Sequence, residues 1–181
     1  MKSELQKIIQ NSSAHTKNRL DNATFILNNP SLMKNLIDFS FDVNDKNHIR
    51  ACCILEKVLE LKLDLVFPFL NTVCENLEKL KNDSAIRSIS RFIMLMVENN
   101  AETTQKYLTE NQIEKITETC FDWLISDIRV APKANAIYTL YELGKYQDWI
   151  YPELKIILVQ DATQQTAGYK AAAKFVLKNI K

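Results

Sequence analysis

Glycine and proline are scarce in this chain. Its 181 residues include only two glycines and four prolines, where average usage would be roughly 7% and 5%. Folds with many strands depend on these residues for their turns, so the scarcity argues against a β-sheet protein. Hydrophobic residues make up 46% of the chain, and a domain of this length buries about 70% of its unfolded surface. We therefore expect an all-α protein that forms a single domain over residues 1–181.

The chain also lacks an excess of charge and a long apolar run. Twenty-three Lys and Arg residues face 22 Asp and Glu residues, for a net charge of +1, which gives no strong field to attract nucleic acid or acidic lipid. The longest purely apolar run, Phe92–Val97, is far short of the roughly 20 residues that span a bilayer. Residues 1–7 carry charges where a secretory signal would be apolar. These features predict a cytoplasmic protein with no membrane partner.

Motifs that carry chemistry are missing as well. The four cysteines form no CxxC pair and lie in apolar helical patterns, as buried thiols of a reducing compartment do. His48 precedes Cys52 by one helix turn, but no third metal ligand is evident. The sequence contains no glycine-rich phosphate loop, HExxH, GxSxG or EF-hand pattern. We expect no catalytic residues, no metal and no cofactor, although a site assembled from distant residues is left open.

Four short stretches of the chain resemble one another. In each, the third residue is basic, the fourth is small, and an apolar helical run follows. The stretches are His48-Ile49-Arg50-Ala51, Ala85-Ile86-Arg87-Ser88, Ala131-Pro132-Lys133-Ala134 and Gly168-Tyr169-Lys170-Ala171. Their basic residues are 37, 46 and 37 positions apart, which is the period range of helical-hairpin repeats.

Breakers and polar turns divide the chain into hairpins. The predicted repeats are residues 30–61, 66–98, 110–144 and 147–181, and residues 1–29 supply capping helices for the open end of the stack. Proline near the start of a first helix fits this division at Pro30, Pro68 and Pro152, since its missing N–H is not needed there. Gly144 is expected at C′ of its helix. The polar segment 98–110 is either a longer loop or a short extra helix.

The early proline, the polar turn and the aliphatic-basic-small start of each second helix together resemble the HEAT repeat over residues 30–181. The resemblance implies a right-handed α-α superhelix of about four hairpins. It also implies that the repeat residues Arg50, Arg87, Lys133 and Lys170 form a structural ladder with acidic turn residues. Asp45, Asp83 and Asp127 stand four to six positions earlier, whereas the fourth repeat has Gln164 and Gln165 there.

Three function classes follow from these patterns. A non-catalytic scaffold or adaptor that binds a macromolecule, most of all a protein, fits a stacked helical repeat. Some DNA glycosylases are built from HEAT-like repeats, but they need a cationic concave face that a net charge of +1 does not favour. Residues 131–135 are faintly similar to part of the fumarase and adenylosuccinate lyase signature. The proline-to-lysine spacing differs and the preceding serines are missing, so we disfavour a lyase.

Aromatic residues gather between positions 121 and 151. The candidates for contact with a partner are Trp123, Tyr138, Tyr141, Tyr146, Trp149 and Tyr151. One interpretation makes them the core between the third and fourth repeats, which the helical spacing of Tyr138 and Tyr141 favours. The other makes them an aromatic groove that receives a peptide or helix of the partner.

Overall fold

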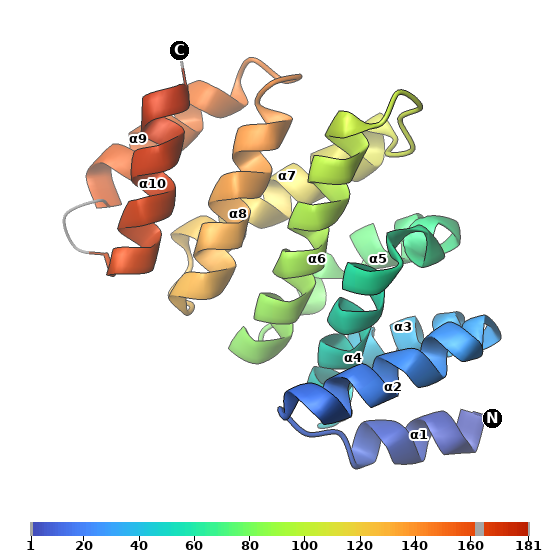
Figure 1. The fold of residues 1–181 in the computed structure, drawn as a ribbon. Coiled ribbons are helices and arrows are strands. Elements are labelled where there is room, and N and C mark those ends of the chain that lie inside the picture. Colours follow the sequence, from blue (N-terminus) through green and yellow to red (C-terminus); the bar gives the residue numbers. More distant parts are fainter. Residues whose placement is uncertain (1, 162–164, 181) are drawn as a thin grey trace. The chain divides into compact units, whose positions relative to one another are not determined.

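The structure, a computed structural model, describes residues 2–161 and 165–180 and is helical throughout its regular elements (Figure 1). The described residues contain no strand, which confirms the all-α prediction. The α-helices are α1 (Lys2–Gln10), α2 (Thr16–Asn28), α3 (Met33–Phe41), α4 (His48–Leu61), α5 (Leu70–Cys74), α6 (Asp83–Glu102), α7 (Glu110–Ile125), α8 (Val130–Leu143), α9 (Ile150–Asp161) and α10 (Ala167–Asn179). Three short 3-10 helices are η1 (Pro30–Leu32), η2 (Leu63–Phe69) and η3 (Leu77–Lys79).

The chain divides into two compact units, residues 1–92 and 93–181, and α6 runs through the division. In the first unit, α4 is the central helix, packed against α1, α2 and α3. Its apolar positions recur at helical spacing, and Ala51, Leu55 and Val58 are fully buried. The repeat predicted at residues 30–61 corresponds to η1, α3 and α4. The single domain predicted for residues 1–181 stays a prediction.

The first half of the repeat predicted at residues 66–98 is not one continuous helix. It is broken into η2, α5 and η3, with Pro68 inside η2. Proline lacks the N–H that an α-helix needs beyond its first turn, and the regular α-helix begins at Leu70, two residues after Pro68. The second half is the long helix α6, which continues to Glu102.

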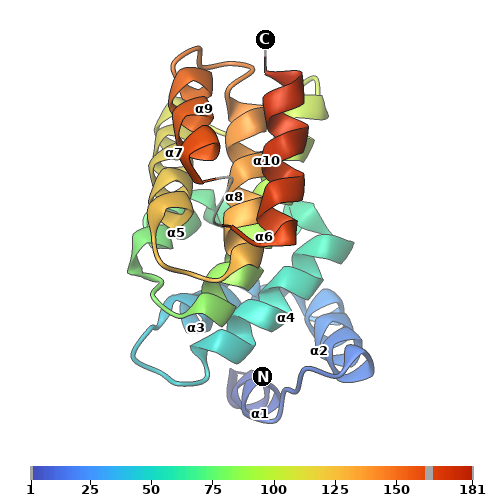
Figure 2. The ribbon, with the colours of Figure 1, turned by 90° about the vertical axis from the view of Figure 1, so that its left-hand side faces the viewer.

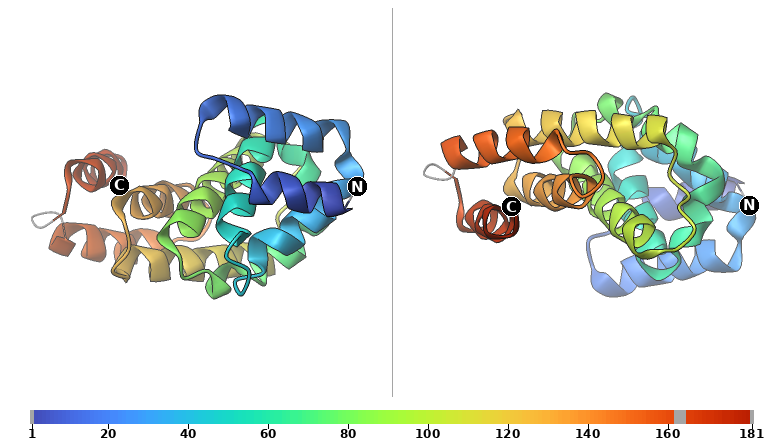
Figure 3. Two further views of the ribbon diagram at one scale, coloured as in Figure 1. Left: turned by 90° about the horizontal axis from the view of Figure 1, so that it is seen from below. Right: turned by 90° about the horizontal axis from the view of Figure 1, so that it is seen from above.

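The second unit is a two-layered arrangement. α7 and α9 lie beside each other in one layer, and α8 and α10 lie in the other (Figure 2). The same two layers are visible from above and below in Figure 3. α8 is the central helix, in contact with α7, α9 and α10, and its side chains Ala136, Ile137 and Leu140 are fully buried. The predicted repeats 110–144 and 147–181 correspond to these helix pairs, except for residues 162–164 and 181, which lie outside the described residues.

The connection between α6 and α7 is a loop and not an extra helix. Thr109 begins α7 with a capping box: its hydroxyl accepts a hydrogen bond from the Gln112 N–H, and the Gln112 side chain accepts one from the Thr109 N–H. The residues between Glu102 and Thr109 form no helix. The loop therefore ends at a fixed helix start.

Gly144 has a different role from the one expected. It is the C-cap of α8, with a right-handed φ of −64°, and not a left-handed C′ residue. A Cβ atom at this position would lie 2.1 Å from the Tyr151 ring. Glycine is therefore required because an aromatic ring packs directly on the backbone.

Candidate binding cleft

The structure separates the six aromatic candidates into two groups and one core residue. Trp123 of α7 is only 5% exposed and cannot contact a partner without rearrangement of the core. Tyr138, Tyr141 and Tyr151 are half-buried. Tyr146 and Trp149, on the connection between α8 and α9, are 58% and 53% exposed.

The half-buried group forms a ring cluster with Phe175 of α10. Tyr141 stacks on Tyr151 with 6.0 Å between ring centroids and meets Phe175 edge-on at 5.7 Å. Tyr138 lies 5.8 Å from the same Phe175 ring. The Tyr151 hydroxyl donates a 3.1 Å hydrogen bond to the Tyr141 carbonyl. These rings join α8, α9 and α10, so this group acts as packing, in line with the core interpretation.

The exposed pair lines a cleft of about 470 Å³ that lies wholly within the second unit. Its walls come from the end of α6, the following loop, the start of α7 and the connection between α8 and α9. The lining residues are Val97, Asn100, Lys106, Leu108, Glu110, Ile113, Glu114, Leu143, Tyr146, Gln147 and Trp149. We call this space the aromatic cleft.

The loop beside the aromatic cleft is held by a buried asparagine. The Asn100 side-chain oxygen accepts hydrogen bonds from the N–H groups of Tyr107 and Leu108, at 2.9 and 3.1 Å. Lys106 donates to the carbonyls of Asn100 and Ala101, at 2.7 and 2.6 Å, which satisfies carbonyls at the end of α6. The Tyr107 hydroxyl donates a 2.7 Å hydrogen bond to the Met96 carbonyl. The wall of the cleft is therefore preformed.

Both exposed aromatic rings are also held in place. The Tyr146 hydroxyl donates a 3.3 Å hydrogen bond to the Ala101 carbonyl, and the Lys106 ammonium lies 5.6 Å from its ring centroid. Trp149 stacks on Phe121 of α7 with centroids 5.7 Å apart. Rings that are exposed yet fixed lose little side-chain entropy on binding, which favours their use as anchors.

The polar groups of the aromatic cleft are mostly acceptors. Glu110 and Glu114 lie one turn apart on α7, and neither side-chain carboxylate forms a hydrogen bond or ion pair with another described residue. The Gln147 side-chain oxygen is buried and also has no hydrogen-bond partner in the described part of the chain. The one cation of the lining, Lys106, already donates to two carbonyls. The accessible acceptors of the cleft are therefore the two exposed carboxylates, which stand beside apolar lining residues.

The repeat residues predicted to form a ladder have dissimilar surroundings. Arg50 donates to the Gln10 carbonyl at 2.5 Å and to the Asn47 side chain at 3.3 Å. Lys133 is largely buried and Lys170 is exposed; neither takes part in an ion pair among the described residues. Arg87 pairs with Glu56 of α4. The ladder with acidic turn residues stays a prediction.

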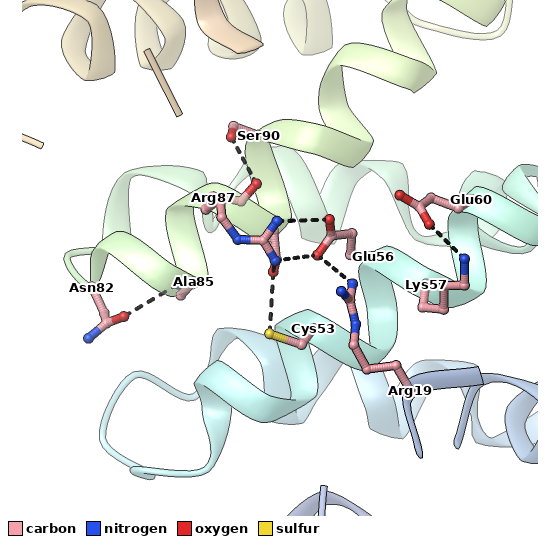
Figure 4. A network of polar contacts seen from close by, with 10 residues as sticks. Arg19, Cys53, Glu56, Lys57, Glu60, Asn82, Ala85, Arg87 and Ser90 are labelled. Carbon is pink, nitrogen blue, oxygen red and sulfur yellow. Dashed lines mark hydrogen bonds and ion pairs between the residues drawn. The ribbon is translucent and has the colours of Figure 1, made fainter. Parts of the chain in front are cut away.

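Glu56 is the centre of a polar network in the first unit (Figure 4). Its carboxylate, 4% exposed, accepts hydrogen bonds from Arg87 at 2.9 and 3.3 Å and from Arg19 of α2 at 3.2 Å. Desolvation lowers the pKa of the Arg87 guanidinium, but the Glu56 charge raises it, and the net shift is upward. The Ser88 hydroxyl donates to Cys53 at 3.4 Å. This network fastens α2 and α6 to α4.

The cysteines and histidines form no metal centre within residues 2–161 and 165–180: no three His, Cys, Asp or Glu side chains there are grouped to hold an ion. His48 Nδ1 and Cys52 Sγ both approach the Ser40 carbonyl, at 3.4 and 3.2 Å. Burial raises the pKa of the Cys120 thiol to about 12, and burial also raises the pKa of the Cys52 thiol. These two thiols are therefore protonated and inert at neutral pH.

Comparison with known protein families, curated proteins and solved structures gave no match to this chain. None of the helices in the described part of the chain has the length and apolar character needed to cross a lipid bilayer.

Sequence reasoning found two residues of the aromatic cleft, Tyr146 and Trp149, and missed the rest. The missed polar residues are Asn100, Lys106, Glu110, Glu114 and Gln147. One signal was available in the sequence: Thr109 followed three positions later by Gln112 is a capping box that fixes the start of α7. That start places both glutamates on the first turns of the helix beside the loop.

Proposed function

We propose that this chain is a non-catalytic helical-repeat scaffold or adaptor that binds a protein partner through the aromatic cleft. The observation that carries the proposal is the pair of exposed, fixed rings, Tyr146 and Trp149, at the mouth of a preformed cleft with an apolar floor. Interface anchors are enriched in Trp and Tyr that pack in such pockets. A HEAT-like right-handed superhelix and a cytoplasmic location are part of the proposal.

A protein partner fits this cleft better than nucleic acid does. Binding to phosphates requires several free cations, whereas the ammonium of Lys106 is bound to two carbonyls. Two carboxylates, Glu110 and Glu114, line the same cleft and would repel a phosphate backbone. The glycosylase-type alternative is therefore disfavoured here, and the lining offers nothing that supports a lyase.

The test is a pull-down of the tagged chain from its native cell extract, with and without nuclease, repeated with Trp149→Ala. Removing a central aromatic anchor costs at least about 2 kcal/mol of binding, or about thirtyfold in affinity. We expect a stoichiometric protein that survives nuclease and is lost with Trp149→Ala. Ile125→Ala is the matched control, because Ile125 is an apolar side chain, 65% exposed, that lies outside the cleft.

Two results would contradict the proposal. Retention of every captured protein by Trp149→Ala would show that the aromatic cleft is not the binding surface. Recovery of nucleic acid alone, released as salt is raised, would replace a protein partner with a nucleic acid.

A further inference from the structure

A shallow apolar groove lies between α7 and α9, the two helices that are neighbours in one layer of the second unit (Figure 2). It has a volume of about 400 Å³ and is lined by Phe121, Trp149, Glu153 and Ile157. Phe121 and Trp149 stack with ring centroids 5.7 Å apart, which holds both rings at this groove. Trp149 is the one residue that it shares with the lining of the aromatic cleft. We call this space the α7–α9 groove.

The helix α9 also carries apolar side chains on its outward face. Ile156 and Val159 are each more than half exposed, while Leu154 and Leu158 of the same helix are fully buried. A helix that is apolar on all sides is ordinarily buried on all sides. The outward face of α9 beside the groove therefore calls for a cover that the described part of the chain does not supply.

Carboxylates border the α7–α9 groove. Glu153 lines it from α9, and Glu118 lies on α7 one turn before Phe121, where residues three apart are neighbours on the helix surface. Both carboxylates are exposed, and neither forms an ion pair or side-chain hydrogen bond with another described residue. An occupant that complements this groove brings apolar side chains together with cations.

The exposed face of α10 has this composition. Lys170, Lys174 and Lys178 follow one another at intervals of four residues, are all exposed, and form no ion pair among the described residues. Beside them, Phe175 is 47% exposed even though its ring also packs on two tyrosines of α8. α10 lies in the other layer of the unit, with α8 (Figure 2). The lysines therefore have no partner on the α7–α9 groove of their own chain.

We infer that the exposed face of α10 in one copy of the chain docks on the α7–α9 groove of a second copy. Phe175 then meets the rings of Phe121 and Trp149, and the lysines of α10 meet the carboxylates that border the groove. A second copy is the occupant because the chain itself carries both complementary faces, and each is unpaired within one molecule. The interface is heterologous, since each copy contributes a different face, so it can continue from copy to copy. This association goes beyond the proposed function, which uses the aromatic cleft.

The test is sedimentation velocity of the full chain as a function of protein and salt concentration. An ion pair between exposed side chains adds up to about fivefold in affinity and is screened by salt. We expect association that grows with protein concentration and weakens between about 0.05 and 0.5 M salt. In a nitrogen-15 NMR spectrum, the indole N–H signal of Trp149 should shift with protein concentration, whereas that of the buried Trp123 should not.

Charge reversal tests the two faces separately. Lys174→Glu combined with Lys178→Glu should weaken association at least about tenfold, and so should Glu118→Lys combined with Glu153→Lys. Each variant alone presents like charges on both faces. An equimolar mixture of the two variants brings opposite charges together again, so the mixture should associate where neither variant does.

The matched control is Lys17→Glu combined with Lys46→Glu. Both lysines are exposed and lie in the first unit, and the control has the same net charge as the α10 variant. It should associate as the natural chain does, which separates the position of the charges from their sum.

The inference is overturned if the natural chain stays monomeric at low salt up to about millimolar concentration, if the control loses association as fully as the α10 variant, or if the mixture fails to associate. A monomeric chain whose captured partner is lost with the α10 variant would assign this face to an acidic protein instead of a second copy. The proposed function fails separately. None of the four reversed residues lines the aromatic cleft, and that proposal is judged by retention of the partner in Trp149→Ala.

Discussion

Replacement of Glu56 by glutamine removes the one carboxylate to which both Arg19 and Arg87 are bound. Glu56 is 4% exposed, whereas the two arginine side chains are 26% and 39% exposed. Glutamine keeps the size of the side chain and one acceptor oxygen, but it removes the charge and turns an amide N–H₂ toward a guanidinium. The variant therefore tests the charge at the centre of the network with little change in packing.

The expected loss follows from the three hydrogen bonds that the carboxylate accepts. A hydrogen bond to a charged group contributes about 1.5–3 kcal/mol when it is buried. Here the partly exposed arginines regain water when the carboxylate is removed, so most of the sum must be discounted. We expect Glu56→Gln to lower the free energy of unfolding by about 2 kcal/mol.

The assay is urea unfolding followed by circular dichroism, with hydrogen exchange by mass spectrometry to attribute the loss to residues 1–92. The matched control is Glu60→Gln, one turn later on α4, where Glu60 pairs with Lys57 and both side chains are partly exposed. This control should change stability by less than about 0.5 kcal/mol. Equal effects of the two substitutions would refute the argument that the buried carboxylate fastens α2 and α6 to α4.

Two further predictions concern the second unit. Gly144→Ala should lower the free energy of unfolding by about 1–3 kcal/mol, because the new Cβ would lie 2.1 Å from the Tyr151 ring. Gly168→Ala is the control: its Cβ would lie 3.3 Å from its nearest neighbour, and it should be close to neutral in the same urea titration. Equal stabilities of the two variants would contradict the ring-on-backbone packing. Burial raises the pKa of the Tyr107 hydroxyl from 10.0 to about 12, so ionisation of Tyr107 favours the unfolded chain. The stability that the neutral hydroxyl contributes is complete below the unfolded-state pKa and is lost as pH rises through the folded-state pKa. Unfolding experiments across that range should show a flatter pH dependence for Tyr107→Phe than for the natural chain, and identical slopes would exclude Tyr107 as a source of alkaline destabilisation.

Most of the helices could be predicted from sequence because their signals are local. Polar turns, prolines and apolar spacing predicted the pairs α3–α4, α7–α8 and α9–α10 close to their observed bounds. The prediction was weakest at residues 63–79, where the structure has η2, α5 and η3. There a proline within an apolar segment permits several short helical forms, and only packing against neighbouring helices decides among them.

The aromatic cleft was less predictable because its residues come from separate segments. The cluster of aromatic residues was visible in the sequence, but Trp123 is core while Trp149 is exposed. Spacing along a chain does not tell these apart when the second residue lies on a connection between helices. The role of Asn100, whose side chain holds the loop after α6, depends on a loop conformation that no periodic pattern encodes.

The sequence by itself determined the helical class. Scarcity of glycine and proline leaves few tight turns, which is a matter of local geometry, and the spacing of apolar residues lets each helix bury one face. The sequence also contains the capping box of Thr109 and Gln112, which fixes the start of α7 within one turn. Only the tertiary structure decided which charges are partners and which rings face solvent. Glu56 meets Arg19 and Arg87 across long stretches of sequence, and such contacts arise from the packing of whole helices, which no short segment specifies alone.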